Sequence, residues 1–157
     1  MKVTFRKTHA KGYSVSIEGP GIASATMDPA PGYDSRLPHD VAHFIVEKEL
    51  GIVGGIFGQL AAGGTAGTFA SSEAKKRRRQ KKRGQEISKQ NKKDALFSEH
   101  AVYAAQSRWE NHEIIPDTKI PATDIERICR AFDEFARSWI ELAVGDSITL
   151  EWKPQKR

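Results

Sequence analysis

The chain has 157 residues, of which 38% are hydrophobic and 29% charged, and this fits one domain with its own core. No apolar run reaches 18 residues and residues 1–20 lack an apolar signal core, so we expect no membrane helix, no secretion signal and a cytoplasmic location. The single cysteine, Cys129, excludes an internal disulfide. The net charge of +5 conceals an uneven distribution, because residues 75–93 carry +10 and the remainder −5.

Alternating polar and apolar residues predict the strands. Residues 2–6 and 13–17 alternate strictly, and the polar link between them ends in Gly12, which predicts a β-hairpin. Residues 22–27 predict a third, weaker strand. Residues 147–152 alternate in the same way, and we expect this last strand to pair with the hairpin.

Apolar residues at helical spacing predict about four helices. In the predicted helix over residues 88–110, Leu96, His100 and Tyr103 share the apolar face. The predicted ranges are residues 38–50 with Gly51 as the stop, a short helix among the glycines of residues 51–67, residues 88–110, and a helix from a capping box at residues 123–126 to Gly145. The fold class is therefore a single α+β domain over residues 1–157, with a small antiparallel sheet (N-terminal hairpin plus C-terminal strand) packed with about four helices.

The first predicted helix carries a candidate metal site. His39 and His43 lie four residues apart, so both rings fall on one helix face, where two imidazoles can bind one metal ion. Glu47 lies one turn further on, and the neighbouring Asp40 could bind the ion or orient a ligand. His100 is the best ligand from elsewhere in the chain, followed by Glu99, His112 and Glu113. This set of nitrogen and oxygen donors suits Zn²⁺.

The same histidines could instead have a purely structural role. A histidine pair at this spacing could cap helix amides, stack on Tyr33 or Phe44, or face solvent. His100 could be a histidine of the core. If a bound ion were catalytic, it would activate water for hydrolysis, but the sequence does not decide whether the protein is an enzyme.

Two families resemble parts of the chain. Residues 39–43, His-Asp-Val-Ala-His, resemble the HDxxH motif of a ubiquinone-biosynthesis family, and this resemblance implies zinc binding through that motif and a later Glu. In this chain, the position equivalent to that zinc-binding Glu lies near Gln59. The pattern of residues 27–34 (MDPAPGYD), 37–40 (LPHD) and 57–69 (FGQLAAGGTAGTF) resembles a family of small uncharacterised bacterial proteins, which implies a bacterial origin and brings no activity.

Two further motif matches lack a required residue. Residues 37–43 look like the dyad of HD phosphohydrolases, but that family needs another histidine on an upstream helix, where strands and loops are predicted here. Residues 58–65 have the spacing of a phosphate-binding loop, but Gly64 stands where a lysine is required. Tight helix packing and a turn explain these glycines better.

A basic run provides the alternative function, a non-enzymatic module. Eight positive charges within nine residues predict salt-dependent, sequence-independent binding to nucleic acid or to an acidic protein surface. No aromatic residue lies among them, so bases have no stacking platform. We expect a mobile basic segment at about residues 71–93 or a solvated helix extension. The basic residues are Lys75, Lys76, Arg77, Arg78, Arg79, Lys81, Lys82 and Arg83.

Overall fold

The computed structural model describes residues 1–66, 69–71, 74–112 and 119–153, with the backbone alone for residues 23, 70–71 and 74–81. Within these residues, one antiparallel sheet has the strand order β4-β3-β2-β1-β5. The predicted hairpin and C-terminal pairing are confirmed, since Val3 lies opposite both Ile17 and Leu150. The strands are β1 (Lys2–His9), β2 (Gly12–Gly19), β3 (Ile22–Met27), β4 (Ala70–Ser71) and β5 (Ser147–Glu151), and the two-residue β4 was not predicted.

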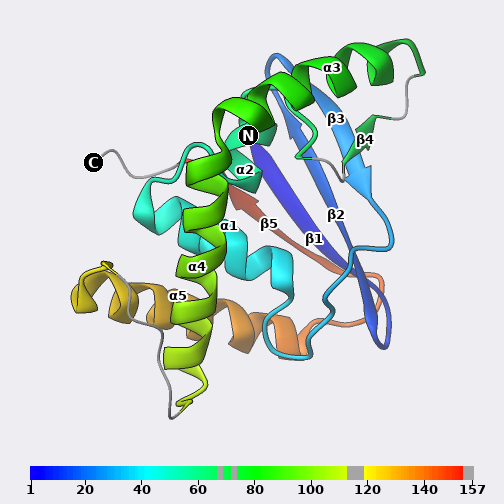
Figure 1. Cartoon of the computed structure of the whole chain (residues 1–157). Coiled ribbons are helices and arrows are strands. Elements are labelled where there is room, and N and C mark those ends of the chain that lie inside the picture. Colours follow the sequence, from blue (N-terminus) through cyan, green and yellow to red (C-terminus); the bar gives the residue numbers. More distant parts are fainter. Residues whose placement is uncertain (67–68, 72–73, 113–118, 154–157) are drawn as a thin grey trace.

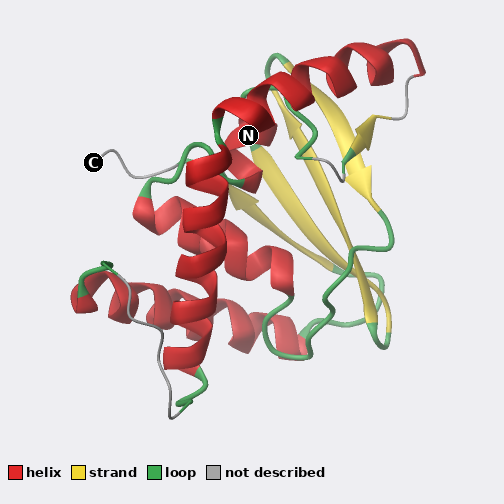
Figure 2. Ribbon diagram, viewed as in Figure 1, coloured by secondary structure: helices red, strands yellow, loops and turns green. Residues whose placement is uncertain are grey.

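The helices gather on one face of the sheet, and α3 runs beside the edge strand β4 (Figures 1 and 2). They are α1 (His39–Leu50), α2 (Ile56–Ala61), α3 (Ala74–Gln90), α4 (Lys92–Trp109) and α5 (Ala122–Glu141). This arrangement confirms the α+β class. The predicted helix over residues 88–110 is divided, because α3 and α4 meet at Asn91. The basic residues belong to α3, so the backbone follows the helix alternative.

The predicted ends of the last helix are wrong. Helix α5 begins directly after Pro121 and has no side-chain cap, so Thr123 lies inside the first turn. It ends at Glu141, and the amide of Gly145 instead donates a hydrogen bond to the carbonyl of Lys7, 2.8 Å away. The Lys7 ammonium donates to the Leu142 carbonyl at 2.9 Å, which places a cation at the C-terminal end of the helix.

The core lies between the sheet and the helices. Phe5 of β1 meets Phe44 of α1 and Phe135 of α5 at ring-centroid distances of 6.0 and 5.9 Å, in edge-to-face contacts. Thr4 and Arg6, which alternate with the buried residues of β1, point to the other face of the sheet. One face of β1 is therefore apolar and covered, as the alternation predicted.

Small side chains let α4 approach α1 closely. Ser98, Ala101 and Ala105 follow a spacing of three and four residues, and each is at most 1% exposed. Because these side chains are short, α4 brings its backbone and its neighbouring polar groups near α1. None of the helices in the described part of the chain has both the length and the apolar character to cross a membrane.

Candidate metal centre

A fixed loop positions the start of α1. The Asp34 carboxylate accepts hydrogen bonds from the amides of Arg36 and Leu37, at 2.7 and 2.8 Å. The His39 amide donates to the carbonyl of Gly32, whose φ of +69° is a conformation that favours glycine. The first histidine is therefore held by the loop as well as by the helix.

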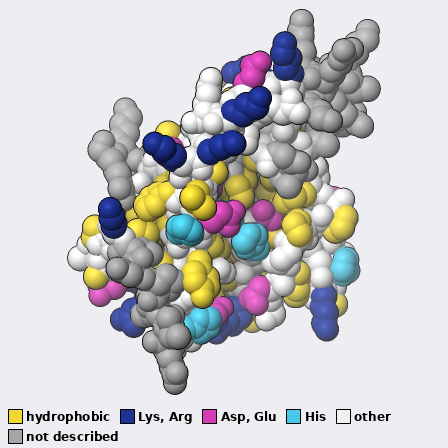
Figure 3. Space-filling view, viewed as in Figure 1, with side chains coloured by type: hydrophobic (Ala, Val, Ile, Leu, Met, Phe, Trp, Pro, Cys, Tyr) yellow, Lys and Arg dark blue, Asp and Glu magenta, His cyan; other side chains and the backbone are white. Residues whose placement is uncertain are grey.

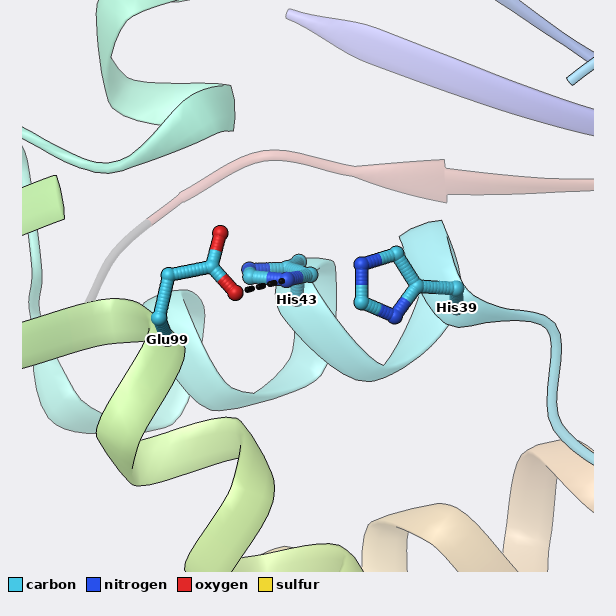
Figure 4. A group of neighbouring side chains, drawn as sticks. All are labelled: His39, His43 and Glu99. Carbon is cyan, nitrogen blue, oxygen red and sulfur yellow. Dashed lines mark ion pairs between the residues drawn. The ribbon is translucent and has the colours of Figure 1, made fainter. Parts of the chain in front are cut away.

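Three side chains converge between α1 and α4. The candidate ligand atoms of His39, His43 and Glu99 all lie within 4.8 Å of one another. The two imidazole rings are 4.6 Å apart at their centroids, and Nε2 of His43 is 3.5 Å from Oε2 of Glu99 (Figure 4). Two ligand atoms of a tetrahedral zinc ion lie about 3.3 Å apart, so the His43–Glu99 pair already has a suitable spacing.

A buried chain of hydrogen bonds orients His43. Oγ of Ser98 donates to Oε1 of Glu47 at 2.8 Å, and this leaves its oxygen to accept from Nδ1 of His43 at 3.2 Å. Both oxygens of Glu47 also accept amide hydrogens from the start of α2, those of Ile56 and Phe57. In the neutral imidazole, this network places the proton of His43 on Nδ1 and the lone pair on Nε2.

The Nε2 atom of His43 is buried without a hydrogen-bond partner among the described residues, and the side chain is 0% exposed. Its nearest charged neighbour is Glu99, which offers only lone pairs when ionised. Two facing lone pairs repel unless a cation lies between them. Either a proton or a metal ion at this point would satisfy both groups.

His39 contributes an imidazole at the solvent side. Desolvation lowers the pKa of His39, and the nearby carboxylates of Asp40 and Glu99 oppose this shift. A lowered pKa keeps this imidazole neutral near pH 7. The neutral form is the one that binds metal ions.

Asp40 faces away from this group. Its Oδ2 lies 2.5 Å from the hydroxyl oxygen of Tyr13, which also lies 2.6 Å from the carbonyl oxygen of Pro31. The Tyr13 hydroxyl donates to the Asp40 carboxylate, and it also lies within donating distance of the Pro31 carbonyl. Burial raises the pKa of Asp40, and the hydrogen bond from Tyr13 opposes this shift. This carboxyl therefore ties α1 to β2.

The other predicted ligands lie apart from the three-residue group. The buried Glu47 carboxylate accepts hydrogen bonds from α2, and its Oε1 lies 3.8 Å from Nδ1 of His43. His100 is exposed, as are its predicted neighbours on the apolar face, Leu96 at 58% and Tyr103 at 61%. His112 pairs with Glu110 at 2.9 Å, and Glu113 lies outside the described residues.

Sequence reasoning ranked Glu99 behind His100 and missed Ser98. The available signal was the small-residue spacing of Ser98, Ala101 and Ala105, which marks the side of α4 that meets α1. Glu99 borders this side. Of the basic run, only Lys82 and Arg83 have described side chains, and both are exposed.

A cavity of about 350 Å³ opens beside the three-residue group. His39 and Glu99 form part of its wall, so a bound ion would face it. The rest of the wall combines apolar and polar side chains from β3, the loops, and α1 to α4: Met27, Pro31, Asp40, Ile56, Gln59, Ala66, Ser88, Ala95 and Ser98.

Comparisons of the chain with protein-family models, with curated proteins and with solved structures gave no match. The two family resemblances therefore stay predictions.

Proposed function

We propose that this protein binds a divalent metal ion, with zinc as the best fit, through His39, His43 and Glu99. Two imidazoles and one carboxylate are a ligand set found in zinc sites that keep an open position. The buried Nε2 of His43 carries the proposal, because it makes no hydrogen bond to the described residues and faces the Glu99 carboxylate at 3.5 Å, where a metal ion would satisfy both groups.

The surroundings of the site support the same function. Metal-binding histidines commonly donate their other ring nitrogen to a hydrogen-bond acceptor, which fixes the tautomer. Ser98, itself held by Glu47, gives His43 such an acceptor. A metal-binding histidine of this kind is thus preorganised.

Zinc titration of protein purified without a polyhistidine tag tests the proposal. We expect one equivalent to bind, and E99Q or H43A to weaken binding by more than the roughly 10–100-fold that loss of a supporting hydrogen bond causes. H100A is the matched control and should bind as the wild type does, since His100 is exposed and outside the group. Equal affinity in the wild type and H43A would refute the site.

The basic helix supports a second candidate, binding to nucleic acid. Helix α3 presents the basic run on a continuous helical backbone, and its described end exposes Lys82, Arg83 and Lys89. Binding to mixed-sequence RNA should weaken steeply with salt and vanish when the basic residues of 75–83 are neutralised. Salt-independent binding, or none at low salt, would count against this function.

A further inference from the structure

We infer that the cavity beside the metal site binds a small organic oxyanion, with its phosphonate, phosphate or carboxylate group on the ion and its apolar part in the cavity. This inference rests on the proposed metal site. It assigns a ligand class to the open side of that site.

The geometry of the wall gives the first step. His39 and Glu99 belong both to the three-residue group and to the cavity wall, so an ion between them would have the cavity on its open side. With three protein ligands, zinc keeps a fourth position for an outside ligand. That position would open toward the cavity, because His39 and Glu99 line it and the third ligand, His43, is fully buried.

The charge balance gives the second step. A divalent ion with two neutral imidazoles and one carboxylate keeps a net charge of +1, which favours an anionic fourth ligand. The other carboxyl group of the wall, that of Asp40, is occupied by a hydrogen bond from the Tyr13 hydroxyl. The site is therefore suited to an oxyanion.

The surface around the cavity adds further positive charge. Figure 3 shows Lys and Arg side chains over α3 and the start of α4. Ser88 and Ala95 line the cavity from these helices, and the exposed Lys89 and Lys92 lie close to them in sequence. Because the chain outside residues 75–93 is net negative, this positive region would guide small anions toward the site.

The size and lining of the cavity give the third step. A volume of about 350 Å³ is at the small end of ligand pockets, which excludes a large ligand. Met27, Ile56 and Ala95 provide apolar wall away from the ion. A ligand with a small apolar group therefore gains more from this cavity than a bare anion does.

Titration calorimetry with methylphosphonate and phenylphosphonate tests the inference. These probes share the oxyanion and differ in the apolar part. Zinc-loaded wild type should bind phenylphosphonate at least about 10-fold more tightly than methylphosphonate, which corresponds to about 1.4 kcal/mol. The metal-free protein should bind neither.

Two sets of variants separate the cavity from the metal. A95L fills the cavity, so it should keep its zinc affinity and lose the preference for phenylphosphonate, whereas H100A, on the same helix and outside the cavity wall, should behave as the wild type does. K89Q/K92Q should weaken both probes, and K11Q, in the turn between β1 and β2 and outside the cavity wall, should not. Zinc binding without phosphonate binding, or an unchanged preference in A95L, would overturn this inference alone. Absence of zinc binding would overturn the proposed function and this inference with it.

Discussion

Nδ1 of His43 lies 3.2 Å from Oγ of Ser98, and this contact helps to join the two helices that form the candidate site. The same hydroxyl donates its proton to Glu47 at 2.8 Å, because a carboxylate can only accept a hydrogen bond. The Ser98 oxygen must then accept the hydrogen bond from His43. Because His43 donates its proton to Ser98, its other nitrogen is available for a metal ion.

Replacing Ser98 by alanine should disturb the histidine without unfolding the protein. S98A removes the acceptor of Nδ1, so the ring tautomer is no longer fixed and zinc affinity should fall by roughly 10–100-fold. The ¹⁵N spectrum of the metal-free wild type should show His43 protonated at Nδ1, and S98A should show a mixture. S107A is the matched control, since Ser107 is equally buried on α4 and its hydroxyl has no described partner. Unchanged tautomer and affinity in S98A would contradict this role of Ser98.

Glu47 should matter for stability. It is 0% exposed and accepts hydrogen bonds from two amides of α2 and from Ser98. E47A leaves these buried donors unpaired, and urea unfolding should show a loss of about 3 kcal/mol. E47Q keeps one acceptor oxygen and should lose less. The exposed E134A is the control, and a loss in E47A no larger than in that variant would be contrary evidence.

Gly32 should hold His39 in place. An alanine there would bring its Cβ to 2.6 Å from the Cβ of His39, on a backbone with a φ of +69°. We expect G32A to lose about 1–2 kcal/mol of stability from the backbone alone and to weaken zinc binding as well. G21A separates the two effects, because Gly21 has a similar φ of +73° with no atom within 4 Å of the added Cβ. Equal zinc affinity in G32A and G21A would show that the loop does not position His39.

Tyr13 should make stability fall at high pH. Burial raises the pKa of its hydroxyl, and the nearby Asp40 raises it further. A raised pKa means that the folded state disfavours ionisation, so this contribution is complete below the unfolded value of 10.0 and declines as pH rises above it. The free energy of unfolding should therefore decline less between pH 9 and 11 in Y13F than in the wild type. The exposed Y103F should follow the wild type, and parallel curves for all three proteins would exclude the effect.

Local patterns were sufficient to predict the hairpin, the last strand and the helix that carries both histidines. The alternation around Phe5 and the stop at Gly51, whose φ is +65°, depend on a few neighbouring residues. These features were confirmed because short-range sterics and burial on one face determine them.

The third ligand could not be predicted in the same way. Leu96 and Tyr103 are large and apolar, so they indicated a buried face around His100, but both are exposed. Close contact between α1 and α4 requires small side chains, and this brings Glu99 to the site instead. Which side of a helix meets its neighbour is a tertiary choice that overrides the simple apolar stripe.

A crystal structure of the zinc-soaked protein, with data collected on both sides of the zinc absorption edge, would test the metal site most directly. We predict one strong anomalous peak within about 2.0–2.2 Å of a nitrogen of His39, Nε2 of His43 and an oxygen of Glu99. The peak should be absent in crystals of H43A soaked in the same way. A wild-type map with no peak between these three side chains, or with zinc only at exposed histidines such as His100, would contradict the site.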